Sequence, residues 1–350
     1  MTTLLLKKLS TGLAVAMVLG VGSSMSVGNA FTSFSYTVTD LGTLGGTYSE
    51  ANGINDAEQV VGSSTIKTSN KSFVRHAFMW EQDKMIDLGT LGGKSSNALS
   101  INNAGKVVGQ SDTSNDPDGG ARHAFLWNKG QMAALKSLGG SYSFAYAINN
   151  AGQVVGDSST SSGSMQAALW QNDKVTGLGT LPGDQVSSAR GINAAGKVVG
   201  VSAISDRLSH PFLWESGNMR ELGNFSIPTS INNRGLVVGY SQSGPSKQRA
   251  VLWKNGIEID LGTLGGTSSI AKAINNVGTV VGSSTTSSGS PHAFVWKNGK
   301  MIELNKLLPP NSGWKLQYAN AINNKGQIVG YGTFEGQTRA FLLKPLKVSP

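Results

Sequence analysis

Residues 101–109 read Ile-Asn-Asn-Ala-Gly-Lys-Val-Val-Gly, and this stretch decides the fold because it recurs along the whole chain. The pattern Ile-Asn, four variable residues, Val or Ile, and then Val-Gly begins at Ile54, Ile101, Ile148, Ile192, Ile231, Ile274 and Ile322. The spacings between successive copies are 47, 47, 44, 39, 43 and 48 residues. Self-similarity at such a period is typical of repeat architectures.

A second pattern follows each copy and ends on tryptophan. It places Trp at 80, 127, 170, 214, 253 and 296, and the seventh copy has Leu343 instead. Each repeat then reads as four short strands, illustrated by residues 145–149, 106–111, 123–127 and 301–304. Turns such as Asn298-Gly299 separate them, and Asn-Gly between apolar runs is a strong hairpin signal.

The recurring residues have a packing explanation. Phe125 and Trp127 lie two apart on one strand and therefore point to the same face, where they suit burial between adjacent sheets. Gly109 allows a close backbone approach or a bulge. The Asn after each Ile is able to bond the backbone of its turn.

Four strands in 39–48 residues match a blade of a β-propeller. Residues 36–42 resemble a fourth strand, whereas the last repeat, from Ala319, supplies only three strands. We therefore predict an all-β, seven-bladed propeller over residues 31–350, a single domain in which the N-terminal strand completes the last blade. Such closure removes two exposed sheet edges.

The first thirty residues predict a signal peptide. Lys7 and Lys8 precede an apolar run, Leu13 to Val21, and small residues lead to Ala30. The run is shorter than the ~20 residues that a membrane anchor needs, and no Cys follows it for lipid attachment. We expect cleavage after Ala30, a mature protein without a transmembrane segment, and a periplasmic or extracellular location.

Composition excludes several classes of function. The absence of Cys excludes disulfides, thiolate metal sites and Cys nucleophiles. The net charge of +9 falls to +7 without residues 1–30, and the basic residues are scattered rather than clustered. Nucleic acid is therefore not an expected partner, and we expect a monomer.

The chain resembles the bacterial extracellular repeat proteins of the HAF type. Their tripeptide stands at His76-Ala77-Phe78, His123-Ala124-Phe125 and His292-Ala293-Phe294, and the phrase Asp-Leu-Gly-Thr-Leu-Gly-Gly occupies residues 87–93. The other repeats depart from the tripeptide, as in His210-Pro211-Phe212. The resemblance implies an exported repeat protein and brings no established reaction, substrate or cofactor.

The candidate chemistry is sparse. The four histidines, His76, His123, His210 and His292, hold equivalent positions on different blades, which predicts structural hydrogen bonds rather than a shared metal. No nucleophile-elbow motif occurs. An oxygen-rich loop is a weak Ca²⁺ candidate through Asp112, Asn115, Asp116 and Asp118; a solvated turn is the alternative, and no other cofactor is expected.

Propellers bind partners through loops at the ring opening. The aromatic candidates there are Tyr48, Tyr142, Trp314 and Tyr318, and the carboxylate candidates are Glu50 and Asp184. We predict a non-catalytic binding or structural module whose ligand is an extracellular glycan or protein. The alternative is a polysaccharide-active hydrolase or lyase with paired carboxylates at the opening.

Overall fold

In the computed structural model, the stretch 101–109 ends the strand β6 (Gly92–Ile101), forms a turn, and begins the strand β7 (Val107–Thr113). The structure describes residues 36–67, 74–114, 122–205, 208–223, 226–242 and 247–346. Residues Phe34–Pro350 form one compact unit. The predicted signal peptide, 1–30, lies outside the described residues. No helix among the described residues is long and apolar enough to span a membrane.

Each repeat forms one antiparallel sheet of four strands, as the sequence predicts. The first three sheets comprise β2 (Gly45–Ile54), β3 (Val60–Ile66), β4 (Arg75–Glu81) and β5 (Lys84–Asp87); β6, β7, β8 (Arg122–Asn128) and β9 (Gln131–Ala134); and β10 (Gly139–Ile148), β11 (Val154–Thr160), β12 (Met165–Gln171) and β13 (Lys174–Gly177). The next three comprise β14 (Val186–Ile192), β15 (Val198–Ser205), β16 (Leu208–Glu215) and β17 (Asn218–Glu221); β18 (Ser226–Ile231), β19 (Val237–Gln242), β20 (Gln248–Lys254) and β21 (Ile257–Asp260); and β22 (Gly265–Ile274), β23 (Val280–Thr286), β24 (Pro291–Lys297) and β25 (Lys300–Glu303). A 3₁₀ turn, η1 (Leu304–Leu307), leads to the seventh sheet.

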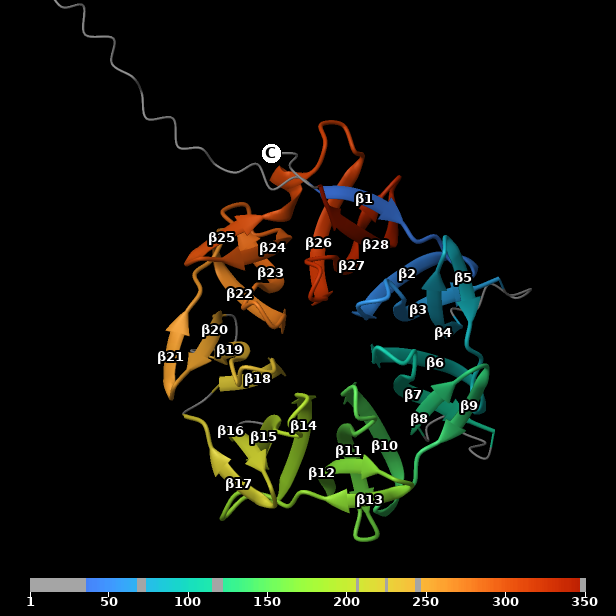
Figure 1. The fold of residues 1–350 in the computed structure, drawn as a ribbon, viewed down its shortest axis with the longest axis vertical. Helices are drawn as coiled ribbons and strands as arrows, with labels where there is room; N and C mark the ends of the chain where they lie inside the picture. The colour runs from blue at the N-terminus through green and yellow to red at the C-terminus, as the bar shows by residue number, and fades with distance from the viewer. Residues whose placement is uncertain are drawn as a thin grey trace, which may run out of the picture. The chain divides into compact units, whose positions relative to one another are not determined.

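The seventh sheet joins the two ends of the chain. It contains β26 (Trp314–Ile322), β27 (Ile328–Phe334) and β28 (Gln337–Pro345), and β1 (Tyr36–Asp40) completes it by pairing antiparallel with β28. Figure 1 shows the sheets arranged as blades around a centre, with β1 beside β28 and the first strand of each repeat innermost. The predicted seven-bladed propeller closed by the N-terminal strand is therefore confirmed.

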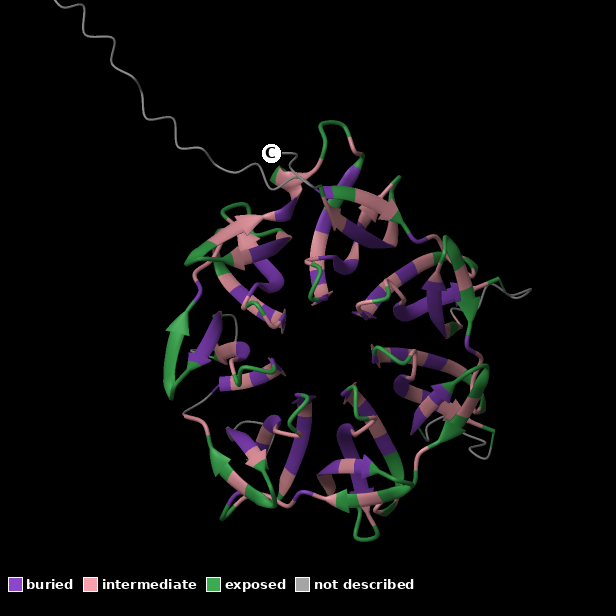
Figure 2. Cartoon of the chain, viewed as in Figure 1, coloured by how far each residue is buried: buried purple, intermediate pink, exposed green. Residues whose placement is uncertain are grey.

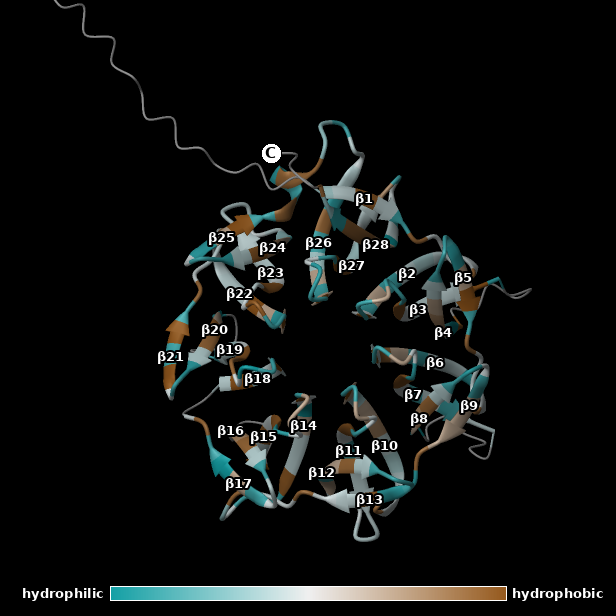
Figure 3. Ribbon diagram, viewed as in Figure 1, coloured by the Kyte–Doolittle hydropathy of each residue, from teal (hydrophilic) through white to brown (hydrophobic). Residues whose placement is uncertain are grey.

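The core lies between neighbouring blades. Among the described residues there are seven clusters of buried apolar side chains, and each draws on two adjacent sheets. Phe125 and Trp127 share one cluster with Val61 of the first blade, as their spacing predicts. Figures 2 and 3 show buried and hydrophobic stretches on the middle strands, such as β7 and β11. Burial of apolar area between the blades is the main favourable contribution to folding here.

The glycine of Val-Val-Gly is required by a close backbone approach. A Cβ on Gly109 would lie 2.0 Å from the carbonyl oxygen of Asn97, because β6 bulges opposite β7 between Ala98 and Ser100. Both predicted roles, close approach and bulge, are thus realised together.

The repeated asparagines link every blade to the next. Their Oδ1 atoms accept backbone N–H groups of their own turns, as when Lys106 donates to Asn102 at 3.0 Å. Their Nδ2 groups donate to the main-chain carbonyl of the equivalent residue in the next repeat, and the donors form a closed circle: Asn55, Asn102, Asn149, Asn193, Asn232, Asn275 and Asn323. The sequence predicts the first set of bonds; the circle between blades appears only in the structure.

Candidate functional site

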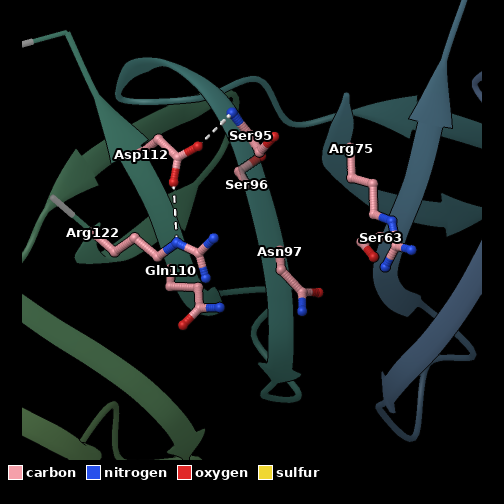
Figure 4. Close-up of a pocket in the computed structure, with 8 residues that line it drawn as sticks. All are labelled: Ser63, Arg75, Ser95, Ser96, Asn97, Gln110, Asp112 and Arg122. Atoms are coloured by element: carbon pink, nitrogen blue, oxygen red, sulfur yellow. Dashed lines mark hydrogen bonds and ion pairs between the residues drawn. The ribbon is translucent and has the colours of Figure 1, made fainter. Parts of the chain in front are cut away.

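A pocket of about 200 Å³ lies between the first and second blades. Every side chain that lines it is polar, and the set carries hydroxyl, amide, guanidinium and carboxylate groups: Ser63, Arg75, Ser95, Ser96, Asn97, Gln110, Asp112 and Arg122. In Figure 4 Asp112 and Arg122 lie on one side of Asn97 and Arg75 on the other. The strands β3 and β4 supply one wall, and β6, β7 and β8 supply the other.

An ion pair orders one side of this pocket. Arg122 Nε lies 3.2 Å from Asp112 Oδ1, and the backbone N–H of Ser95 donates to Asp112 Oδ2 at 3.1 Å (Figure 4). The carboxylate of Asp112, a predicted calcium ligand, thus already has two protein partners. Its predicted companions, Asn115, Asp116 and Asp118, lie outside the described residues. Among those described, no group of three or more His, Cys, Asp or Glu side chains is placed to hold a metal ion.

The other side of the pocket rests on predicted site residues of the first blade. The Arg75 guanidinium carbon lies 4.0 Å from the centre of the Tyr48 ring. The Tyr48 hydroxyl donates to Glu50 Oε2 at 2.6 Å, and Ser63 Oγ donates to Glu50 Oε1 at 3.1 Å. Burial, and then the bond to Glu50, raise the pKa of Tyr48. Tyr48 therefore stays a neutral hydrogen-bond donor that holds Glu50 in place.

Tyr318 stacks on Tyr331, and Tyr331 lies near Glu50. Their rings stack with centroids 4.7 Å apart, and burial raises the pKa of Tyr331 to about 12, with the charge of Glu50 acting in the same direction. Of the predicted binding residues, the structure thus brings Tyr48, Glu50 and Tyr318 together near the junction of the last and first blades. These blades also meet at one parallel backbone pair, Tyr48 with Thr338.

The remaining predicted binding residues lie elsewhere. Trp314, a predicted binding residue, is only 8% exposed: it stacks on Phe334 at 4.9 Å and meets Phe341 edge-on. The insertion before β26 seats the ring in the core between the last two blades, where apolar burial outweighs exposure. Tyr142 is exposed on the third blade.

Asp184 is also committed to a local partner. Its side chain is only 1% exposed and lies 3.1 Å from Nδ1 of His210. Glu50 belongs to the first blade and Asp184 adjoins the fourth, and each is satisfied there by its own donors. No catalytic carboxylate pair follows from these contacts.

His76, His210 and His292 are local hydrogen-bonding residues, as the sequence predicts. His76 meets Asp87 at 2.8 Å and His292 meets Glu303 at 2.6 Å, each across one hairpin. Burial raises the pKa of Glu303, but the bond from His292 and the charges of His292 and Lys306 together outweigh burial, so the net pKa is lowered. These pairs tie the third strand of a blade to its fourth.

Sequence reasoning missed two features, a hollow at the ring centre and a charged group that includes Arg190 of β14. A hollow of about 180 Å³ is lined by Ile, Asn and the following residue of every repeat, with Asp56 accepting amide bonds from Asn103 and Asn324. The second feature is a charged group around Arg190. Arg190 and Lys272 share one repeat position, two before the Ile, where most repeats carry an uncharged residue. This departure of two repeats from the uncharged pattern was the feature of the sequence that could have indicated the charged group.

Comparison with solved structures supports the fold. The propeller domain of the Trilobed protease from Pyrococcus furiosus matches with a TM-score of 0.58 and 7% identity over 88% of this chain and 97% of that one. That domain is described as having an open velcro topology, whereas here β1 completes the last blade.

Two larger peptidases match as well. A puromycin-hydrolyzing peptidase from Mycobacterium tuberculosis gives a TM-score of 0.58 and 11% identity, with 86% and 51% of the two chains covered. An acylaminoacyl peptidase from Pyrococcus horikoshii gives 0.53 and 10%, with 88% and 53% covered. This chain spans about half the length of these two enzymes, and the likeness is one of fold alone.

No curated protein sequence matches the chain. A family model does match, over residues 42–219, from the start of the first blade into the fourth. The chain belongs to the family described as "Protein of unknown function (DUF3466)".

Proposed function

We propose that the protein is an exported, non-catalytic binding module that holds a glycan in the pocket between its first and second blades. The observation that carries this proposal is the wholly polar lining of that pocket. Pockets for drug-like ligands are mostly apolar, whereas a sugar presents many hydroxyls that alternate as donors and acceptors. Amide, hydroxyl, guanidinium and carboxylate side chains supply both roles.

The pocket is also rigidly held. Arg75 is positioned by the face of Tyr48 and Arg122 by the carboxylate of Asp112. Groups that are already ordered lose little entropy when a ligand binds. Export rests on the character of residues 1–30, and a location in the periplasm or outside the cell places the pocket among cell-surface and matrix glycans.

The test is a glycan array with the purified chain, followed by calorimetry on each hit. We expect Arg122→Gln to weaken binding at least about tenfold, because a hydrogen bond to a charged group contributes about 1.5–3 kcal/mol. Arg220→Gln, at an exposed position on β17, is the matched control and leaves binding unchanged. Absence of any hit, or equal loss in both variants, overturns the proposal.

Turnover and location are measured on the same material. Release of new reducing ends from a bound polysaccharide would replace the binding module with the hydrolase or lyase alternative. Cell fractionation with N-terminal sequencing tests export: a mature chain beginning at residue 31 outside the cytoplasm supports it, and an intact cytoplasmic chain contradicts it.

A further inference from the structure

We propose that a cavity between the sixth and seventh blades binds an alkyl carboxylate, with the chain inside the cavity and the carboxylate at its opening. The cavity has a volume of about 250 Å³, and its walls come from both blades and from β1, which lie together in Figure 1. It is a different site from the polar pocket between the first and second blades. The proposal does not depend on the function proposed for that pocket.

The cavity wall is mainly aliphatic. Tyr36 of β1 contributes to it together with side chains from the turn after β22 and from β24, β25, η1, β26 and β28: Val277, Val295, Ile302, Leu307, Ile322 and Pro345. Tyr36 and Val295 are buried, whereas Val277 is 67% exposed and therefore marks the open side. An alkyl chain that enters removes this apolar surface from water. An apolar cavity of about 150 Å³ holds the six carbons of benzene, so this cavity has room for a chain of about eight.

The seventh repeat differs from the other repeats at this junction. Leu343 pairs with Ile328 in the register in which Trp127 pairs with Val107, so it holds the position of the repeated tryptophan. The apolar cluster between the sixth and seventh blades contains Leu343 together with Val295 of the cavity wall. Leucine is smaller than tryptophan, so less side-chain volume is present to fill the space between these two blades.

Pockets at two other blade junctions have a different character. One of about 270 Å³, between the second and third blades, is lined by Trp170 and by four charged residues. Another of about 400 Å³, between the seventh and first blades, is lined by Trp80 and also by four charged residues. Of these three pockets, only the one between the sixth and seventh blades has a mainly apolar lining, and there the repeated tryptophan is replaced.

The charged groups that line the cavity are cations. Lys297 and Lys325 are both exposed and both belong to the lining, whereas none of the described acidic side chains does. The charge of Lys325 also acts on Asp56 and Glu58 of the first blade, but each of these carboxylates is bonded to donors of its own. The lining is therefore complementary to a ligand with an apolar body and a negative head.

The test titrates octanoate into the purified protein at pH 7.5 by calorimetry, with butanoate and hexanoate as shorter ligands. We expect saturable binding that strengthens about fourfold with each added CH₂ group, as burial of the chain requires. Octanol and octylammonium have the same chain and a different head, and we expect both to bind more weakly than octanoate. No saturable binding, or an affinity independent of chain length, overturns the proposal.

Val277→Asp tests whether this cavity is the site. The new carboxylate repels octanoate and replaces an apolar wall, so we expect affinity to fall at least about tenfold, and an exposed side chain is replaced without loss of the fold. Ile257→Asp is the matched control, because Ile257 is 66% exposed on β21 and lies outside the cavity lining. Equal affinities of these two variants would show that octanoate binds elsewhere.

Lys325→Met tests the charge separately from the chain. We expect it to weaken octanoate about two- to fivefold, the contribution of an exposed ion pair, and to leave octanol unchanged. Lys254→Met, at an exposed position on β20, is the control and changes neither affinity. Equal loss of octanoate and octanol would contradict the role given to the carboxylate. Arg122→Gln, in the polar pocket, leaves octanoate binding unchanged, so this site and the proposed glycan site are tested independently.

Discussion

The side-chain amide of Asn323 donates to the main-chain carbonyl of Asn55 at 3.0 Å, across 268 positions of sequence. This bond completes the circle in which each repeat's asparagine bonds the next repeat. Together with the pairing of β1 and β28, it joins the two ends of the chain. Ring closure therefore rests on a polar contact at the centre as well as on a sheet further out.

Asn323→Ala is expected to lower the free energy of unfolding by about 1–3 kcal/mol, because buried partners lose their bonds. The variant removes the donor to Asn55 and the acceptor for the backbone N–H groups of Lys325 and Gln327. Urea denaturation measures the effect. Asn218→Ala, exposed on β17, is the control and costs less than about 0.5 kcal/mol. Equal stabilities of the two variants would show that the circle contributes nothing.

Gly109→Ala tests the close approach in the second blade. The new Cβ would lie 2.0 Å from a backbone oxygen, which a side-chain rotation cannot relieve. We expect a loss of about 3 kcal/mol, at the upper end of the usual cost of overpacking. Gly130→Ala, where φ is +88° and no atom lies within 4 Å, measures backbone strain alone, about 1 kcal/mol. A smaller loss at Gly109 than at Gly130 would contradict the steric explanation.

Trp314→Ala separates core packing from ligand recognition. Because Trp314 is buried against Phe334 and Phe341, we expect a loss of about 3–5 kcal/mol in thermal or urea unfolding. Glycan affinity per folded molecule should stay unchanged. Tyr142→Ala, at a side chain that is 44% exposed, is the comparison and stays within about 0.5 kcal/mol of wild type. Lost affinity in a folded Trp314 variant would restore its predicted role in recognition.

The pH dependence of the free energy of unfolding should reveal the raised pKa of Asp157. Its native pKa of about 6 exceeds the ordinary value of 3.8, so the folded chain holds a proton that the unfolded chain releases between those values. Stability from this group is therefore present below pH 4 and lost as pH rises through 6, by about 3 kcal/mol in total. The difference in unfolding free energy between wild type and Asp157→Asn, followed from pH 4 to 7, isolates it from groups such as Asp87, whose net pKa is lowered. Parallel pH profiles would refute the raised pKa.

Much of the site was visible in the sequence only as separate residues. Tyr48 and Glu50 were predicted, and alternation along one strand explains why they lie on the same face. Their contacts with Arg75 and Ser63 were not predicted, because these residues lie on other strands of the blade and the register between β2 and β3 depends on bulges. Trp314 was also singled out from the sequence, but the structure buries its ring in the core. It is the one tryptophan outside the repeated position, and an unusual aromatic residue can equally fill a local gap in the core.

The sequence by itself determined the number of blades, their four strands and the closure by an N-terminal strand, since these follow from local patterns repeated in order. Glycine and asparagine at fixed positions carry that information because each is required by a turn or a backbone approach within its own repeat. Only the tertiary structure decided which variable residues meet. Arg190 and Tyr146 come from neighbouring blades, and the guanidinium carbon lies 4.5 Å from the ring centre because the two blades pack side by side. Periodicity specifies the blade, whereas the chemistry between blades depends on the positions where the repeats differ.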